Sequence, residues 1–284
     1  KLYLAYLLDP LGQAQISYEL PKQSLQVDVL FTPTATVDDI HTLGLLGQLA
    51  AHDCLFEVFW NQPRPKAVRE CQLKLFLRQK ELYNQARGKK TPLAEESLPI
   101  LWILTTSASQ TLLDSFGATA KPATYVTGVY RFPEAQKTGI VALNQLPTTT
   151  DTLWLRLLGK GATRRQACDD LRALPKDTPY RDGVLKLLAD YLRQIETKPN
   201  PTNDEKEFFM ELSPAYYQWE NETLQKGQQK MQRVFVENLL KTRFGKLDKA
   251  LSRLIDPLLK VSPEETVQLL LNLSRQELLA KFRS

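Results

Sequence analysis

The chain has 284 residues, of which 43% are hydrophobic and 24% charged, with a formal net charge of +5. This balance predicts a soluble protein with a core, and the length suits one large or two ordinary domains. No apolar run reaches the roughly 18 residues that a membrane span needs, and the three scattered cysteines exclude a disulfide framework. No secretory signal is visible, so we expect a cytoplasmic protein without a membrane partner.

The first half of the chain predicts alternating helices and strands. The chain starts without methionine, directly inside a first helix, so we expect its natural start to be missing or removed. Period-2 alternation predicts a hairpin around the turn 21–24, and an apolar stripe predicts the most regular helix. In order, the expected elements are a helix over 1–8, strands over 13–20 and 25–31, a helix over 37–51, a strand over 54–60, a helix over 66–87 and a buried strand over 99–104.

The second half becomes progressively helical. Strands are expected near 124–132 and 139–143 and helices over 164–174 and 183–195, while 152–158 fits either type. Residues 197–204 contain two prolines and no apolar residue, which predicts a linker. We therefore expect a first domain over 1–196, a linker over 197–206 and a helical C-terminal domain over 207–284.

The predicted C-terminal domain contains only helices. A long helix over 216–244 ends at Gly245, and a further helix covers 247–259. Ser262 and Ser274 each precede an acid by three residues, which is typical of the N-cap of a helix. Such a module can pair with a second copy, so we expect a homo-oligomer formed through these helices.

Two acids project from the predicted central strands. Asp28 lies in the second hairpin strand and Glu57 in the next strand, and an acid from each of two paired strands can share one hard cation. A four-residue turn makes Glu19 a diagonal neighbour of Asp28, where it can add a third carboxylate. Residues two apart on a strand share a face, but Phe59 occupies the position where a Glu-x-Lys spacing has its lysine.

The order of helix, hairpin, Glu-bearing strand, helix and buried strand resembles the core of the PD-(D/E)XK phosphodiesterases. The segments that carry the resemblance are 25–33 (LQVDVLFTP), 55–57 (LFE), 69–75 (RECQLKL) and 99–105 (PILWILT). They are similar to uncharacterised cyanobacterial proteins of the recombination-promoting nuclease and putative transposase family. The tail over 243–282 resembles the helical domain of unknown function often appended to them. The resemblance implies an α/β, restriction-endonuclease-like core with an all-helical C-terminal module.

The resemblance also implies roles for the acids. In an active core, Asp28 and Glu57 hold magnesium, with Glu19 as a further ligand, and a lysine stabilises negative charge that develops on the phosphate. Lys74 is the candidate for this lysine, because migration to the following helix is a known variation of the superfamily. Without a metal, Asp28 is a solvated strand residue, and a buried Glu57 needs Lys74 or Arg78 as its ion-pair partner.

A run of basic residues spans positions 64–90, which contain nine lysines and arginines and only two acids. Such a run is typical of a solvated helix face, and it also suits contacts with phosphates. The candidates for contacts with double-stranded DNA are Arg64, Lys66, Arg69 and Arg78. Two functions follow: a degenerate, nuclease-like protein that binds DNA or a protein partner without efficient catalysis, or a magnesium-dependent DNA endonuclease with a migrated lysine.

Overall fold

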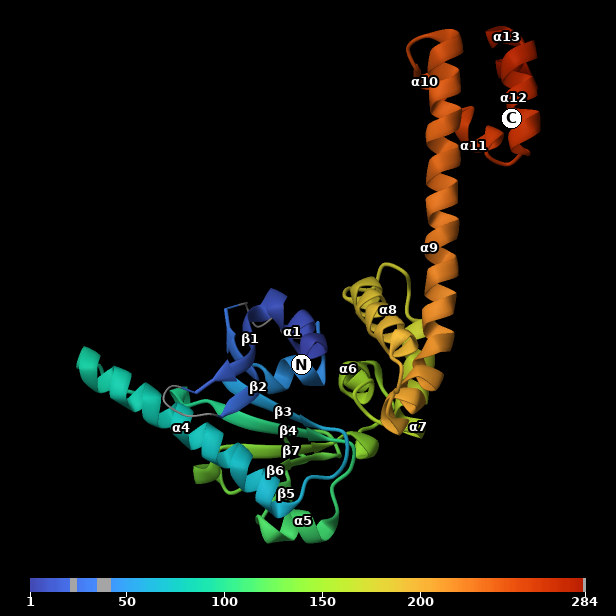
Figure 1. The fold of residues 1–284 in the computed structure, drawn as a ribbon. Helices are drawn as coiled ribbons and strands as arrows, with labels where there is room; N and C mark the ends of the chain where they lie inside the picture. The colour runs from blue at the N-terminus through green and yellow to red at the C-terminus, as the bar shows by residue number, and fades with distance from the viewer. Residues whose placement is uncertain (21–24, 35–41, 283–284) are drawn as a thin grey trace. The chain divides into compact units, whose positions relative to one another are not determined.

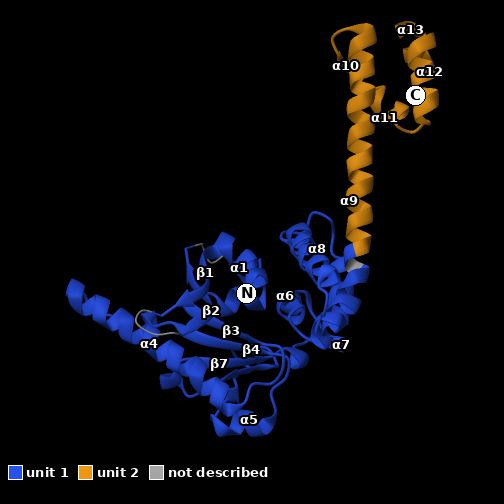
Figure 2. Ribbon diagram, viewed as in Figure 1, with its two compact units in different colours: residues 1–216 blue, residues 217–284 orange. Residues whose placement is uncertain are grey.

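The computed structural model describes residues 1–20, 25–34 and 42–282. The chain divides into two compact units, residues 1–216 and residues 217–284 (Figure 2). The division falls inside one helix, α9 (Asn203–Phe244). No helix within the described ranges is long and apolar enough to cross a membrane.

The first unit is built on a mixed seven-stranded sheet with the order β1-β2-β3-β4-β7-β6-β5 (Figure 1). The first three strands form an antiparallel meander, and β3, β4 and β7 are parallel to one another. The strands are β1 Gly12–Glu19, β2 Gln26–Pro33, β3 Cys54–Phe59, β4 Ile100–Thr105, β5 Thr119–Ala120, β6 Val129–Arg131 and β7 Thr138–Ala142. The expected α/β class is confirmed at this level.

Helices surround the sheet and make up the second unit. In the first unit they are α1 Leu2–Leu8, α3 Leu45–Leu49, α4 Pro65–Lys89, α5 Gln110–Ser115, α6 Leu153–Arg156, α7 Ala162–Ala173 and α8 Arg181–Thr197. After α9 come α10 Lys249–Ser252, α11 Ile255–Leu258, α12 Pro263–Asn272 and α13 Arg275–Lys281. The 3-10 turns are η1 Asp9–Leu11, η2 Glu95–Ser97, η3 Glu134–Gln136, η4 Leu143–Gln145 and η5 Thr150–Thr152.

The central strands are apolar on both faces because helices cover both sides of the sheet. On one face, the α4 stripe of Val68, Cys71 and Leu75 belongs to the same buried cluster as Leu55 and Ile103. Parallel strands buried on both faces are expected to be continuous apolar runs rather than alternating ones. This explains why β4 is recognisable from its sequence and why α4, with one apolar stripe, must lie on the sheet.

Several expected boundaries differ from the structure. Of the expected 37–51 helix, the described residues 42–51 contain a turn over 42–44 and the helix α3, and the helix ends before 50–51. Residues 37–41, like the hairpin turn 21–24, lie outside the described residues. The ambiguous segment 152–158 contains the short helix α6. The pair β5 and β6 occupies part of 119–131, and β5 was not expected because two residues carry no periodic signal.

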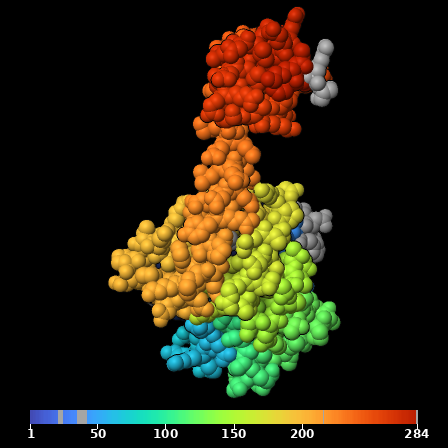
Figure 3. Space-filling model, turned by 90° about the vertical axis from the view of Figure 1, so that its right-hand side faces the viewer, coloured from blue at the N-terminus to red at the C-terminus, as the bar shows by residue number. Residues whose placement is uncertain are grey.

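The helix α9 begins earlier than expected and its first turns belong to the first unit. The Phe208 ring lies 5.1 Å from that of Tyr191 on α8, and Glu211 pairs with Arg164 on α7 at 3.0 Å. Figure 3 shows the atoms of α7, α8 and the start of α9 packed side by side. The compact first unit therefore extends to residue 216, beyond the expected linker over 197–206.

The second unit has a small core of its own. Val236 and Leu240 of α9 are buried with residues of the following short helices, including Leu258 and Leu270. The N-caps expected from sequence are confirmed: the Ser262 hydroxyl accepts from the Glu265 amide, and Ser274 forms a capping box with Glu277. These caps fix where α12 and α13 begin, since they satisfy amide groups that a helix start leaves without partners.

Candidate functional site

Glu57 forms a buried ion pair with Lys74. Glu57 lies in β3 between Leu55, which belongs to the buried cluster under α4, and Phe59, which packs against that cluster. Because residues two apart on a strand share a face, the Glu57 side chain points to the α4 face. Lys74 projects from α4 toward it, and its Nζ lies 2.9 Å from Glu57 Oε1. The two side chains are only 5% and 16% exposed. Of the two cations considered for Glu57 from the sequence, Lys74 is the one in contact.

The surroundings of Glu57 disfavour its charge. Burial raises the pKa of Glu57 above its usual value, the hydrogen bond and charge of Lys74 act in the opposite direction, and the nearby Asp28 carboxylate raises it further. Burial also raises the pKa of the neighbouring Cys71 to about 12. A carboxylate in such a place depends on its cation, because removing that cation leaves an uncompensated buried charge.

Phe59 fills the strand position where the Glu-x-Lys spacing has its lysine. Its ring packs against the hydrophobic cluster formed by the sheet and α4. The strand therefore supplies no cation after Glu57, and the ammonium in contact with the Glu57 carboxylate comes from Lys74 on α4 instead. This arrangement is what a migrated lysine requires, and it is equally what a structural ion pair requires.

Asp28 is half-buried and both of its carboxylate oxygens have partners. The Lys1 Nζ lies 2.7 Å from Oδ1, and the backbone amide of Val58 donates to Oδ2 at 3.0 Å. The Lys1 ammonium also reaches the hydroxyl of Ser17, which adopts a positive φ of 51° within β1. Asp28 is thus tied to Lys1, the residue that precedes α1, and to β3. Lys1 was not expected as its partner, since nothing in the local sequence links residues 27 positions apart.

Glu19 lies at the exposed end of β1. It pairs in register with Gln26, as the four-residue turn predicts. Its carboxylate accepts a hydrogen bond from the side-chain amide of Gln26 at 3.1 Å. Across residues 1–20, 25–34 and 42–282, no three or more His, Cys, Asp and Glu side chains are grouped to hold a metal ion. Asp28 and Glu57 have the oxygen chemistry that magnesium uses. Each, however, already holds an ammonium where a cation would bind, so the present arrangement does not fit the metal.

The candidate DNA-contacting residues separate into two groups. Arg64, Lys66 and Arg69 are exposed at the start of α4. Arg64 and Lys66 also line an open cavity of about 440 Å³ at the end of β3. Arg78, by contrast, is half-buried, pairs with Glu81 at 2.6 Å and lies over the Tyr18 ring. Its charge is therefore neutralised inside the protein, and only the first group is presented to a polyanion.

A second cavity adjoins Asp28. It measures about 460 Å³, and its lining is mostly apolar, with Trp60 and Tyr191 among the residues that form it. Asp28 thus borders a largely apolar space, whereas Glu57 is absent from its lining. The two acids do not open together into one polar cleft.

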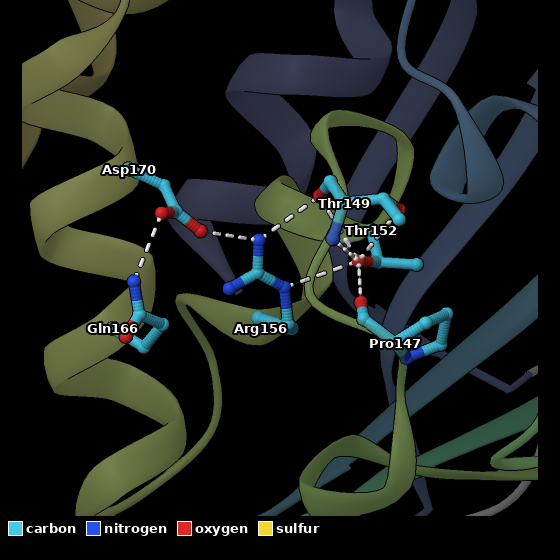
Figure 4. A network of polar contacts seen from close by, with 6 residues as sticks. All are labelled: Pro147, Thr149, Thr152, Arg156, Gln166 and Asp170. Atoms are coloured by element: carbon cyan, nitrogen blue, oxygen red, sulfur yellow. Dashed lines mark hydrogen bonds and ion pairs between the residues drawn. The ribbon is translucent and has the colours of Figure 1, made fainter.

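Two buried arginines were not expected from the sequence. Arg156 donates to the Thr149 carbonyl and the Thr152 hydroxyl and pairs with Asp170 at 2.7 Å (Figure 4). Arg164 pairs with Glu211 and lies over the ring of Phe208. These contacts connect loops and helices that are remote in sequence, and no local pattern distinguishes these arginines from surface ones.

Comparison of the chain with family models, curated proteins and solved structures finds no match in any of the three. The resemblance to the PD-(D/E)XK family therefore rests on the quoted sequence segments. The function has to be argued from the contacts of Glu57, Lys74 and Asp28 and from the exposed cations of α4.

Proposed function

We propose that the protein is a degenerate, nuclease-like protein that binds double-stranded DNA without efficient catalysis. The observation that carries this proposal is the contact of Lys74 with Glu57 inside the core. Glu57 and Lys74 have the chemistry of a catalytic site, but their contact joins β3 to α4. The exposed cations at the start of α4 supply the DNA-binding part.

The loss of catalysis follows from where the charges are placed. A lysine that stabilises a phosphate must direct its ammonium at the developing negative charge. The Lys74 ammonium is instead bound to Glu57 at 2.9 Å and its side chain is mostly shielded from water. Asp28 is similarly held by Lys1. Both acids therefore carry the internal partners that a buried carboxylate needs.

DNA binding is supported by Arg64, Lys66 and Arg69. All three side chains are exposed within six residues of one another, at the N-terminal end of a long helix. This end of a helix carries a partial positive charge, which adds to the attraction for phosphates. Contacts of this kind position a protein on DNA without reading its sequence.

One observation favours a second function, a magnesium-dependent DNA endonuclease. Lys74 contacts Glu57 from the following helix, and migration of the lysine to that helix is a known variation of the superfamily that the sequence resembles. Asp28 and Glu57 would hold the cation, which polarises a phosphate and activates water when bound. Lys1 and Lys74 would first have to leave the two carboxylates.

Fluorescence anisotropy with a labelled blunt duplex tests the binding proposal. We expect the Arg64→Ala/Lys66→Ala/Arg69→Ala variant to bind more weakly, with a dependence on log salt less steep by about 2–3, because three phosphate contacts are lost. A matched variant removes three exposed lysines elsewhere in the first unit: Lys121→Ala/Lys186→Ala/Lys206→Ala. Equal losses in both variants, or no duplex binding by the unmodified protein at low salt, would contradict the proposal.

Nicking of supercoiled plasmid in the presence of magnesium tests the absence of catalysis. We expect no nicking above that of the Asp28→Asn and Glu57→Gln variants. Magnesium-dependent nicking that disappears in both variants, and persists in the triple-lysine control, would replace this proposal with the endonuclease.

A further inference from the structure

The helix α4 has an exposed face that the core does not use and that shares only Arg69 with the proposed duplex-binding residues. Its buried residues are Val68, Cys71, Gln72 and Leu75, all in its first half, and in Figure 1 its C-terminal half extends beyond the strands. Beside the buried face lies a row of exposed side chains that we name the outward stripe. Its members are Arg69, Leu73, Phe76, Lys80, Tyr83 and Arg87.

The spacing of these residues follows the helix. Successive members are three or four residues apart, so all lie on one side of a helix with 3.6 residues per turn. From Arg69 to Arg87 the rise is roughly 27 Å at 1.5 Å per residue. Cations alternate with apolar side chains along this length: Arg69 precedes Leu73 and Phe76, and Lys80 and Arg87 flank Tyr83.

The cations of the outward stripe are not neutralised. Arg69, Lys80 and Arg87 are exposed and form no ion pair with any described residue. This distinguishes them from Lys74 and Arg78 on the flanks of the same helix, which pair with acids. The stripe therefore presents positive charge to solvent along the helix.

The apolar members of the stripe are unusually exposed. Leu73, Phe76 and Tyr83 are 48%, 44% and 45% exposed, and Tyr83 keeps this exposure while its hydroxyl donates to Glu95. Single exposed apolar residues are common on protein surfaces. Three of them in line, each beside an unpaired cation, form a continuous surface that suits a partner with both negative charge and flat apolar faces.

We infer that the outward stripe binds single-stranded nucleic acid. An unpaired strand provides phosphates for Arg69, Lys80 and Arg87, and its bases have free faces that stack on Phe76 and Tyr83. A duplex offers the phosphates but keeps its bases stacked inside, which leaves Leu73 and Phe76 in water. The inference rests on the proposed nucleic-acid binding and adds a substrate class: duplex DNA that continues into an unpaired strand.

An acidic membrane surface fits less well. A helix lying in the membrane interface inserts an apolar face and keeps its cations on a separate polar face. In the outward stripe the cations and apolar residues lie on the same line, so insertion of Phe76 would carry Arg69 and Lys80 toward the acyl chains. The mixed row suits a nucleic-acid strand, in which charged phosphates and the flat faces of the bases also alternate.

Anisotropy with two labelled DNAs tests the inference on the full chain. One DNA is a blunt duplex, and the other is the same duplex with an oligothymidine tail. We expect the tail to tighten binding roughly tenfold, since stacked bases contribute strongly. Leu73→Ala/Phe76→Ala should remove most of this gain, because Tyr83 is then the one stacking ring left in the stripe. Phe235→Ala, which removes an equally exposed ring in the second unit, should preserve it. In Lys80→Ala/Arg87→Ala the salt dependence for the tailed DNA should flatten by about 1–2.

The outcomes separate the inference from the proposed function. If the blunt duplex binds and the tail adds nothing, the inference is wrong and duplex binding stands. If neither DNA binds, both are wrong. If the tail adds nothing but phosphatidylserine vesicles bind in a manner that depends on Leu73 and Phe76, the stripe is a membrane surface. Unchanged affinity of Leu73→Ala/Phe76→Ala for the blunt duplex shows that this variant is folded.

Discussion

Replacing Lys74 with methionine tests whether the contact with Glu57 stabilises the fold. The change removes the ammonium and keeps an unbranched side chain, and it leaves the Glu57 carboxylate, 5% exposed, without its cation. Breaking a buried pair from one side costs about 3–5 kcal/mol. The Lys74 side chain is 16% exposed, and Glu57 can take up a proton because burial already raises its pKa. We therefore expect the lower end of that range, about 3 kcal/mol.

Thermal unfolding followed by tryptophan fluorescence measures this cost, since Trp102 is buried in β4 of the same sheet. For a unit of this size, each kcal/mol shifts the melting temperature by roughly 2–4 °C, so Lys74→Met should lower it by about 6–12 °C. Lys66→Met is the matched control on the same helix. Its pair with Glu70 is 3.8 Å long and both side chains are largely exposed, so we expect a loss under about 0.5 kcal/mol.

A double variant separates the orphaned charge from other effects. Adding Glu57→Gln to Lys74→Met removes the uncompensated carboxylate and should restore at least half of the lost stability. Two results would refute the reasoning: a Lys74→Met effect no larger than that of Lys66→Met, or a double variant no more stable than Lys74→Met. Either would mean that the pair is open to water and that Lys74 is available for another role.

Three further predictions concern buried groups. Because burial raises the pKa of Glu57, the folded chain binds the Glu57 proton more tightly than the unfolded chain does. The stability that this proton contributes is fully present below pH 4.5 and is lost as the pH rises through the pKa of the folded chain. The melting temperature of the wild type should therefore rise relative to that of Glu57→Gln as the pH falls from neutral. Burial raises the pKa of Cys71 to about 12, so iodoacetamide should label it far more slowly in the native protein than in urea; equal rates would contradict its burial. Arg164→Met removes the cation over the Phe208 ring and weakens the pairing of Glu211, and should cost about 2–3 kcal/mol in urea unfolding; an unchanged midpoint would show that these contacts contribute little.

Local patterns were sufficient for most of the first unit. The α4 helix was recognisable because its apolar residues recur at helical spacing, and β4 because a short run such as Leu101–Leu104 must be buried on both faces. Local patterns failed where the position of a segment depends on contacts with residues distant in the sequence. The first turns of α9 belong to the first unit because Phe208 and Glu211 contact α8 and α7, which no pattern within α9 indicates.

The sequence by itself determined that Glu57 lies on an apolar strand face, that Phe59 stands where a lysine is expected, and that a buried Glu57 needs a cation. It left Lys74 and Arg78 as equal candidates, because both project from the same helix one turn apart. Only the tertiary structure decided between them: the placement of α4 on the sheet brings Lys74 to Glu57 and Arg78 to Glu81. The physical reason is that periodicity reports which face of an element is buried, whereas an ion pair depends on the distance between two elements remote in sequence.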